Sequence, residues 1–325
     1  MRAVTVTDSS RLAVTDVADP ELQLGGAVVR VKACGICGSD LHMLEAGIVP
    51  AGAIMGHEAS GVVEAVASDV EGLRPGDHVA VHPFDPCGSC AACLAGASQR
   101  CVNTATTTIG LGFRAGAYAE LLEVSAQMLV RMPGDVPVEY CALAEPLSVA
   151  LHGFRRSRFE PGSKVGVIGC GPIGLCAVLA ARTLGAGRIW ACDMNEYRAS
   201  LAAAVGADET GATPREADIV IECAGARGTV DLAVAAARSG GQVVLLAVNI
   251  KGDSVWPFVW VTKEVDIVPC LGYNLAEYRE AADWIATERV DVAPLITKRV
   301  PLEGTDAAFA DLLNGAPEGK VLVTP

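Results

Sequence analysis

The sequence predicts an α/β protein of two domains, in which a β-rich part is followed by a doubly wound parallel sheet with helices on both faces. The chain has 325 residues, 51% of them hydrophobic, and a single hydrophobic core stops growing at about 250–300 residues. Short β-like runs fill the first part of the chain, whereas strands and helices alternate in the later part. Length and pattern together therefore predict two folded units.

Charge and cysteine content exclude several classes of partner. The 38 acidic and 25 basic side chains leave a formal charge of −13, which argues against a nucleic-acid partner because phosphate binding needs clustered Lys and Arg. No apolar run approaches the roughly 18 residues of a membrane span, and the N-terminus lacks a signal peptide. We therefore expect a soluble, cytoplasmic protein without a membrane partner, whose twelve cysteines serve as thiols or metal ligands rather than disulfides.

The first part of the chain, from residue 3 to about residue 132, is expected to form a largely antiparallel β domain. Its apolar runs are short and are broken by Gly, Pro and Asp, which is typical of strands joined by turns. From residue 137 onward the apolar spacing becomes helical. The predicted strands are AVTVTD, AVVRVKA, SGVVEAVASDV, DHVAVHP, AYAELLEV and QMLVRMP.

From residue 164 strands and helices alternate, and the strands are continuous apolar runs, as a sheet covered on both faces requires. Eleven residues, 207–217, separate the second helix from the strand at 218–223, fewer than a parallel crossover of about a dozen or more residues normally takes. We therefore expect the third strand to be very short or missing, with no helix linking it to the fourth. The predicted strands are KVGVIG, RIWACD, DIVIEC, GQVVLLAV and VDIVPC, and the predicted helices are PIGLCAVLAARTLG, NEYRASLAAAVG, RGTVDLAVAAARSG and LAEYREAADWIA.

The C-terminal tail returns to β texture after the last predicted helix, and we expect it to rejoin the first domain. The first domain is accordingly assigned to residues 1–149 and 288–325, with a cysteine-rich lobe at about 86–102. The parallel-sheet domain is assigned to residues 150–287.

A glycine-rich turn follows the first strand of the parallel sheet and opens a helix. Gly169, Gly171 and Gly174 stand in G-x-G-x-x-G register, with Pro172 and Ile173 between them. The first glycine permits the tight turn, the second lets the backbone approach a pyrophosphate, and the third lets helix and strand pack closely. Pro172 suits the first helical turn, where its missing N–H is no loss. These five residues are predicted to contact a dinucleotide.

An acidic residue at the end of the next strand completes the dinucleotide signature. Asp193 lies at about the expected 20-residue offset and can accept both hydrogen bonds of an adenosine ribose diol. A carboxylate there repels a 2′-phosphate, so NAD is favoured over NADP. Arg198, five residues further on, either lies along the same ribose or is a surface residue of the helix.

Four cysteines in one Gly- and Ala-rich loop predict a structural metal site. Cys87, Cys90, Cys93 and Cys101 are spaced C-x2-C-x2-C-x7-C. Four thiolates so close in sequence can close a tetrahedral shell around zinc and leave no vacant position. Two disulfides are the main alternative. An iron–sulfur cluster is less favoured because this spacing is not a ferredoxin pattern.

A second set of metal-ligand types is scattered along the chain. Cys34 and Cys37 form a C-x-x-C pair, but no thioredoxin-like βαβ pattern surrounds them. His57 and Glu58 occur in a GHE stretch, and Glu145 opens a predicted helix. A catalytic zinc needs about three protein ligands and one open position, which Cys37, His57 and a carboxylate provide.

Taken together, these motifs resemble the zinc-dependent medium-chain dehydrogenases, within them the sorbitol (polyol) and threonine dehydrogenase side of the zinc alcohol dehydrogenase group. The likeness covers nearly the whole chain. It rests on the ordered motifs CGICGSDLH, GHE, the four-cysteine lobe, GAYAEL, EPLSVALHG, GCGPIG with Asp193, and GKVLV.

The resemblance implies a GroES-like catalytic domain and a Rossmann NAD-binding domain, with the active site between them. Cys37 and His57 match the family's catalytic zinc ligands. Glu145 stands where the polyol dehydrogenases carry a glutamate that binds zinc directly or through water, and Glu58 is the carboxylate that can exchange with it. Asp40 matches the residue that orients the zinc-binding histidine.

The resemblance further implies roles for two polar residues, and the chain departs from the family at Gly38. Ser39 and His42 match a relay that carries the alcohol proton to solvent. Cys34 falls outside the ligand positions and is expected to pack in the core. Gly38 stands where many alcohol dehydrogenases place an arginine on the pyrophosphate, so that contact must come from elsewhere. Arg114, beside the expected pocket mouth, is expected to form a rim salt bridge rather than to meet substrate.

These expectations converge on an enzyme that transfers hydride between NAD(H) and a secondary alcohol, polyol or amino alcohol, with the corresponding ketone as product. Two zinc ions per chain are expected, one catalytic and one structural, and the resemblance implies a homodimer or homotetramer. One alternative is a carbonyl reductase that runs the same reaction in reverse. Another is a non-catalytic module that binds NAD and zinc, which need not keep an open metal position.

Overall fold

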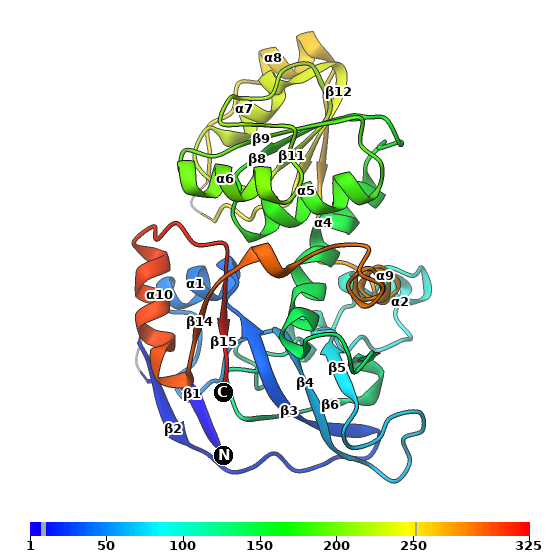
Figure 1. The fold of residues 1–325 in the computed structure, drawn as a ribbon, viewed down its shortest axis with the longest axis vertical. Coiled ribbons are helices and arrows are strands. Elements are labelled where there is room, and N and C mark those ends of the chain that lie inside the picture. The colour runs from blue at the N-terminus through cyan, green and yellow to red at the C-terminus, as the bar shows by residue number, and fades with distance from the viewer. Residues whose placement is uncertain (8–10, 251) are drawn as a thin grey trace.

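The computed structural model (Figure 1) describes residues 1–7, 11–250 and 252–325. Two large β-sheets, one mostly antiparallel and one entirely parallel, form its two halves, and β1 pairs with β2 in a separate two-stranded sheet. The seven-stranded sheet has the order β14-β15-β3-β4-β5-β7, with β6 paired to β3, and the six-stranded sheet has the order β10-β9-β8-β11-β12-β13. The predicted α/β class, with an antiparallel and then a parallel sheet, is confirmed.

The first half of the chain supplies short strands and a cysteine-rich loop, as predicted. Residue 8, at the end of the first predicted strand, lies outside the described residues. The elements are β1 (Arg2–Val6), β2 (Leu12–Asp16), β3 (Gly26–Gly35), α1 (Gly38–Glu45), β4 (Glu58–Val66), β5 (His78–Val81), α2 (Ala91–Leu94), α3 (Thr104–Thr107), β6 (Leu121–Ser125), β7 (Leu129–Met132) and the 3-10 helix η3 (Val138–Leu143).

The parallel sheet follows the order 3-2-1-4-5-6 of a doubly wound fold. The short third strand is confirmed, because β10 has two residues and no helix lies between it and β11. The helix predicted through residue 240 instead ends at Ala236, and β12 begins at the next residue, Ala237. The elements are β8 (Lys164–Ile168), α5 (Pro172–Thr183), β9 (Arg188–Cys192), α6 (Glu196–Ala204), β10 (Glu209–Thr210), β11 (Ala217–Glu222), α7 (Thr229–Ala236), β12 (Ala237–Leu245), α8 (Pro257–Lys263) and β13 (Asp266–Pro269).

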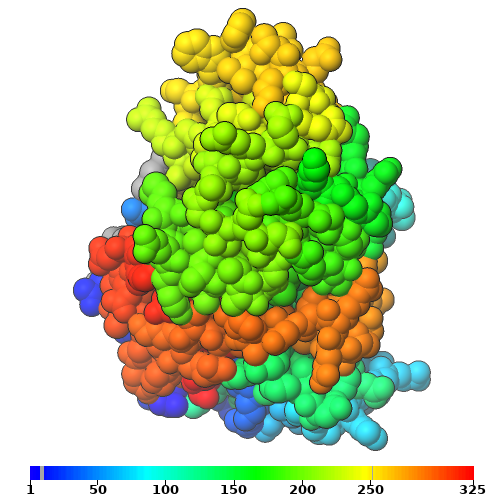
Figure 2. Space-filling view, turned by 45° about the horizontal axis from the view of Figure 1, so that its top comes forward, coloured from blue at the N-terminus to red at the C-terminus, as the bar shows by residue number. Residues whose placement is uncertain are grey.

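The C-terminal segment returns to the antiparallel sheet. Strand β15 (Lys320–Val323) pairs antiparallel with β3, and β14 (Ile296–Val300) pairs parallel with β15. Helix α10 (Thr305–Leu313) lies between these two strands in sequence. In Figure 2 the orange and red surface of this segment lies directly below the green surface of the parallel-sheet half. The first and last parts of the chain therefore share one sheet, and the exact domain limits stay predictions.

Helix α4 (Ala144–Arg156) runs between the two halves (Figure 1) and contains the predicted boundary at 149/150. An acidic residue in its first turn and two arginines in its last turn complement the helix dipole. The helix packs against α5 and against α9 (Leu275–Ala286). His152 and the Glu277 carboxylate, 2.9 Å apart, tie α4 to α9. Helix α4 therefore connects the two halves of the protein through its packing against α5 and α9.

Within the described ranges, no helix combines the length and the apolar character that crossing a membrane requires.

Candidate functional site

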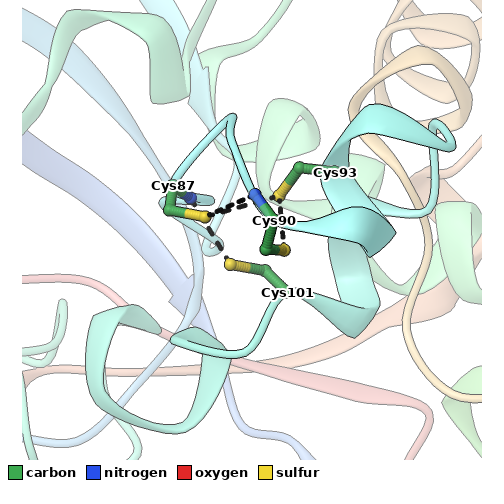
Figure 3. Close-up of side chains that lie close together, drawn as sticks. All are labelled: Cys87, Cys90, Cys93 and Cys101. Atoms are coloured by element: carbon green, nitrogen blue, oxygen red, sulfur yellow. Dashed lines mark hydrogen bonds between the residues drawn. The ribbon is translucent and has the colours of Figure 1, made fainter.

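The four lobe cysteines converge between β5 and β6 (Figure 3). The Sγ atoms of Cys87, Cys90, Cys93 and Cys101 all lie within 4.8 Å of one another. The Cys90–Cys93 sulfurs are 3.5 Å apart, well beyond the roughly 2.05 Å of a disulfide, and all twelve cysteines are free. The disulfide alternative is therefore wrong for this loop. The arrangement suits a closed shell of four thiolates around structural zinc.

Backbone N–H groups point at two of these sulfurs, those of Cys87 and Cys101. The backbone N–H groups of Ser89 and Cys90 donate to Cys87 Sγ and lower the pKa of that thiol to about 6. Another two backbone N–H groups, of Cys87 and Asn103, donate to Cys101 Sγ at 3.4 Å each. Because zinc binds the thiolate rather than the thiol, this donor pattern suits a metal site.

A second group of ligand atoms forms where two neighbouring strands end. Cys37, His57 and Glu58 each place a ligand atom within 4.8 Å of the other two. In the antiparallel register Gly35, the last residue of β3, faces Glu58, the first residue of β4. The ladder therefore brings Cys37, two residues beyond β3, next to His57, one residue before β4. Three such ligands of mixed type suit a catalytic zinc with one open position.

A buried carboxylate supports both Cys37 and His57. Asp40 is fully buried in α1, and its Oδ2 accepts hydrogen bonds from the Cys37 backbone N–H at 3.1 Å and from the Tyr118 hydroxyl at 2.7 Å. Its Oδ1 lies 3.3 Å from His57 Nδ1. This places Asp40 where an orienting partner of a metal-bound histidine belongs. Gly56, before His57, is required here because a Cβ would meet the Tyr118 ring at 2.7 Å.

The charge of Asp40 also acts on the histidine. Burial by itself lowers the pKa of His57, but the carboxylate of Asp40 and the nearby Cys37 outweigh burial and hold that pKa well above its usual range. Zinc binds neutral imidazole, so metal binding would release a proton from this ring.

Glu58 forms a fully buried ion pair that the sequence did not suggest. Lys320 Nζ lies 2.6 Å from Glu58 Oε1 and donates to the Ile36 carbonyl at 3.1 Å. Both side chains are 1% exposed. A Cβ at Gly35 would meet Glu58 Oε2 at 2.0 Å, so only glycine leaves room for this carboxylate. The pair neutralises Glu58 beside the metal group.

Glu145, the third predicted carboxylate, lies near this group but outside the set of three. It is 5% exposed in the first turn of α4, and the Tyr273 hydroxyl donates to its Oε1 at 2.8 Å. Burial and, next, the charge of Glu58 raise the pKa of Glu145 to about 7. Its predicted binding to zinc, directly or through water, stays a prediction.

Ser39 and His42 lie three residues apart on α1, so they share one face of that helix. Ser39 is partly buried and His42 is exposed. Neither side chain forms a hydrogen bond among the described residues, so the predicted relay stays a prediction. Cys34 is fully buried in the core, as expected. Arg114 forms the expected salt bridge, with Asp85 at 2.8 Å.

The glycine-rich turn has the geometry that a pyrophosphate needs. Gly169 adopts φ +88°, and a Cβ on Gly174 would meet the Gly169 carbonyl oxygen at 1.8 Å. A Cβ on Gly171 would meet nothing within 4 Å, so this glycine leaves an open cradle at the N-terminus of α5. Pro172 and Ile173 form the first turn of α5. The residues present therefore fit a dinucleotide.

The acidic residue of the signature borders the same turn. Asp193 accepts hydrogen bonds from the backbone N–H groups of Cys170 and Asn195, both at 2.8 Å. Each carboxylate oxygen has a second lone pair that a ribose hydroxyl could use. Arg198 points toward the C-terminal segment instead, because its guanidinium donates to the carbonyls of Ala316 at 2.9 Å and Glu318 at 3.3 Å. Its predicted ribose contact stays a prediction.

Helix α4 links the dinucleotide turn to the metal region. Helix α5, which begins at the turn, packs against α4, and the first turn of α4 carries Glu145. Cys176, in the second turn of α5, is fully buried, and burial raises the pKa of its thiol.

Three side chains of the site, Tyr118, Tyr273 and Lys320, were not predicted from the sequence. Tyr118 and Lys320 lie in the motifs GAYAEL and GKVLV, where a polar side chain next to apolar residues was the available signal. Tyr273 had no such signal, because it lies 128 residues from the glutamate it contacts.

Comparison with known proteins agrees with this geometry. Residues 23–134 match the alcohol dehydrogenase GroES-like domain family, and residues 172–287 match the zinc-binding dehydrogenase family. The chain is 32% identical to L-threonine 3-dehydrogenase of Bacillus subtilis, over 100% of this chain and 99% of that protein. It is 30% identical to sorbitol dehydrogenase of the same species, over 100% and 97%.

The solved structures give the same result at the level of the fold. A zinc-binding dehydrogenase of Sinorhizobium meliloti, bound to NADP, matches with a TM-score of 0.91 and 31% identity, over 100% of this chain and 99% of that chain. The expected pairing of a GroES-like domain with a Rossmann domain is thereby confirmed.

Proposed function

The chain belongs to the zinc-dependent medium-chain dehydrogenase family, and from that premise we propose that it transfers hydride between NAD(H) and a secondary alcohol or polyol. Amino alcohols are included because one relative is named a threonine dehydrogenase. The observation that carries the proposal is the group of Cys37, His57 and Glu58, whose ligand atoms lie within 4.8 Å of one another, in a chain that also has an open dinucleotide turn. A three-ligand site keeps a position for substrate, which a purely structural metal site does not need.

Some residues of the site would bind the zinc, and others would orient the zinc ligands. Cys37 and His57 would hold the zinc together with Glu58 or Glu145, and Asp40 would keep the His57 ring in one orientation. When bound, the zinc supplies Lewis-acid polarisation of the substrate oxygen, and the nicotinamide supplies the hydride acceptor. Ser39 and His42 would pass the alcohol proton to solvent. The four-cysteine lobe would hold a second, structural zinc.

NAD is proposed as the preferred cofactor. Asp193 borders the glycine-rich turn and would face the adenosine ribose, where its charge favours a diol and repels a 2′-phosphate. One solved relative is bound to NADP and another to NADH, so the preference depends on this chain's own residue.

A screen of substrates with both cofactors tests the function directly. We expect the zinc-loaded protein to form NADH with at least one polyol, secondary alcohol or amino alcohol, and to use NAD at least about tenfold better than NADP, a difference of about 1.4 kcal/mol. Absorbance at the NADH band measures both. A preparation that binds NADH and two zinc ions but oxidises none of these alcohols, and reduces none of the ketones, would favour the non-catalytic module.

We also propose that the chain assembles as a homodimer or homotetramer. Side chains of Val255, Trp256, Phe258 and Val261 are 41–74% exposed around α8, at the gold-coloured tip of the molecule (Figure 2). They adjoin β13, the edge strand of the parallel sheet, and contiguous exposed apolar side chains are typical of interaction sites. Light scattering measures the molar mass, and a value of one chain at micromolar concentration would contradict the proposal.

A further inference from the structure

Tyr273 connects the parallel-sheet half to the metal group. It is completely buried in the segment between β13 and α9, and its hydroxyl donates to Glu145 Oε1 at 2.8 Å. Glu145 belongs to the first turn of α4, 128 residues earlier in the chain. Among the described residues this is the hydrogen bond that the Glu145 side chain makes, so Tyr273 alone restrains the carboxylate.

The tyrosine ring is itself held in place by aromatic neighbours from both halves. The Tyr278 ring stacks on it at 5.8 Å between centroids and 19° between planes. Phe84 and His82, which follow β5, contact it at 5.3 Å and 5.7 Å. Such packing leaves the ring one position. The direction of the hydroxyl toward Glu145 is therefore set before any ligand binds.

Three charged groups act on the Glu145 carboxylate and would turn it if this bond were lost. Glu58 acts on it as a like charge, whereas His57 and Lys320, the partner of Glu58, act on it as opposite charges. A carboxylate rotates readily about its last bond, since that torsion is broad. Because the Tyr273 hydroxyl donates to Glu145 Oε1, the other carboxylate oxygen, Oε2, remains available to a ligand.

We propose that Tyr273 is a positioning residue, which commits Glu145 Oε1 to the parallel-sheet half and leaves Oε2 to face the catalytic metal or its water. The inference rests on the proposed function and extends it, because it makes the geometry of the metal site depend on a side chain from the cofactor-binding half. The orientation of the Glu145 carboxylate would then depend on how the two halves of the protein are placed relative to each other.

The test compares Tyr273→Phe with Tyr278→Phe. Both changes remove one hydroxyl from the same aromatic stack, but the Tyr278 hydroxyl makes no hydrogen bond to any described residue. We expect Tyr273→Phe to lower kcat about 10–100-fold, as loss of a ligand's hydrogen-bond partner typically does, with a smaller change in KM. In protein whose catalytic zinc is replaced by Co²⁺, the visible absorption bands should shift, since they report ligand geometry. Tyr278→Phe should change neither.

The outcomes separate this inference from the proposed function. If wild-type protein oxidises no alcohol, the proposed function fails. If wild-type protein is active and Tyr273→Phe matches Tyr278→Phe in kcat and in the cobalt spectrum, the positioning role is wrong. A Tyr273→Phe chain that is unfolded at the assay temperature would also overturn it, because the hydroxyl would then serve the fold. In a Glu145→Ala background, Tyr273→Phe should have no further effect on the spectrum.

Discussion

Replacing Cys37 with Ser is expected to lower kcat/KM for alcohol oxidation by about a thousandfold or more while leaving NADH binding nearly unchanged. Cys37 is one of three side chains whose ligand atoms gather within 4.8 Å, and a hydroxyl is a much poorer zinc ligand than a thiolate. Lewis-acid stabilisation supplies several kcal/mol, and each 1.36 kcal/mol is tenfold in rate. The dinucleotide turn is a separate element, so its affinity for NADH should persist.

The adjacent cysteine provides a matched control for this change. Cys34 is fully buried and lies outside both ligand groups, so Cys34→Ser makes the same chemical replacement without removing a ligand. Zinc analysis should find two ions per chain in the wild type and in Cys34→Ser, but one in Cys37→Ser. Unchanged turnover in Cys37→Ser, or a zinc count that stays at two, would refute the catalytic site.

Replacing Lys320 with Met is expected to reduce the free energy of unfolding by about 3–5 kcal/mol near neutral pH. The change leaves Glu58, 1% exposed, as an uncompensated buried charge, and removing one partner of a buried pair has this typical cost. The lost bond to the Ile36 carbonyl adds to the effect. Urea unfolding of the metal-free proteins measures the difference and avoids a contribution from bound zinc.

A surface lysine and a double variant complete the experiment. Lys298 pairs with Asp311 where the two side chains are 37% and 56% exposed, so Lys298→Met should cost at most about 1 kcal/mol. Combining Lys320→Met with Glu58→Gln should recover part of the loss, because the unpaired charge is gone. A Lys320→Met protein within 1 kcal/mol of wild type would mean that the pair does not hold this part of the core.

Local patterns were sufficient for the features that depend on neighbours in sequence. The lobe of Cys87, Cys90, Cys93 and Cys101 closes over 15 positions, and the turn from Gly169 to Gly174 lies within one strand–helix unit. The eleven residues 207–217 likewise leave too little chain for a helix, and the structure has none there. In each case the spacing itself limits the geometry.

Contacts between distant segments could be found only in part. The grouping of Cys37 with His57 needed either a family resemblance or the β3–β4 register, which depends on how the sheet assembles. Arg198 carries a plausible charge at a plausible position, yet its guanidinium donates to the carbonyls of Ala316 and Glu318. Nothing in the local sequence around residue 198 indicates that the C-terminal segment passes beside it.

The sequence by itself determined which chemistries this protein can perform, because ligand type, glycine spacing and the acidic residue after the second strand are properties of short segments. The tertiary structure alone decided how the catalytic metal group is held: Lys320 against Glu58, and Tyr273 against Glu145. Both contacts join segments more than a hundred residues apart. Their partners are chosen by burial, since a charge or hydroxyl removed from water must find whichever complementary group the fold brings within reach.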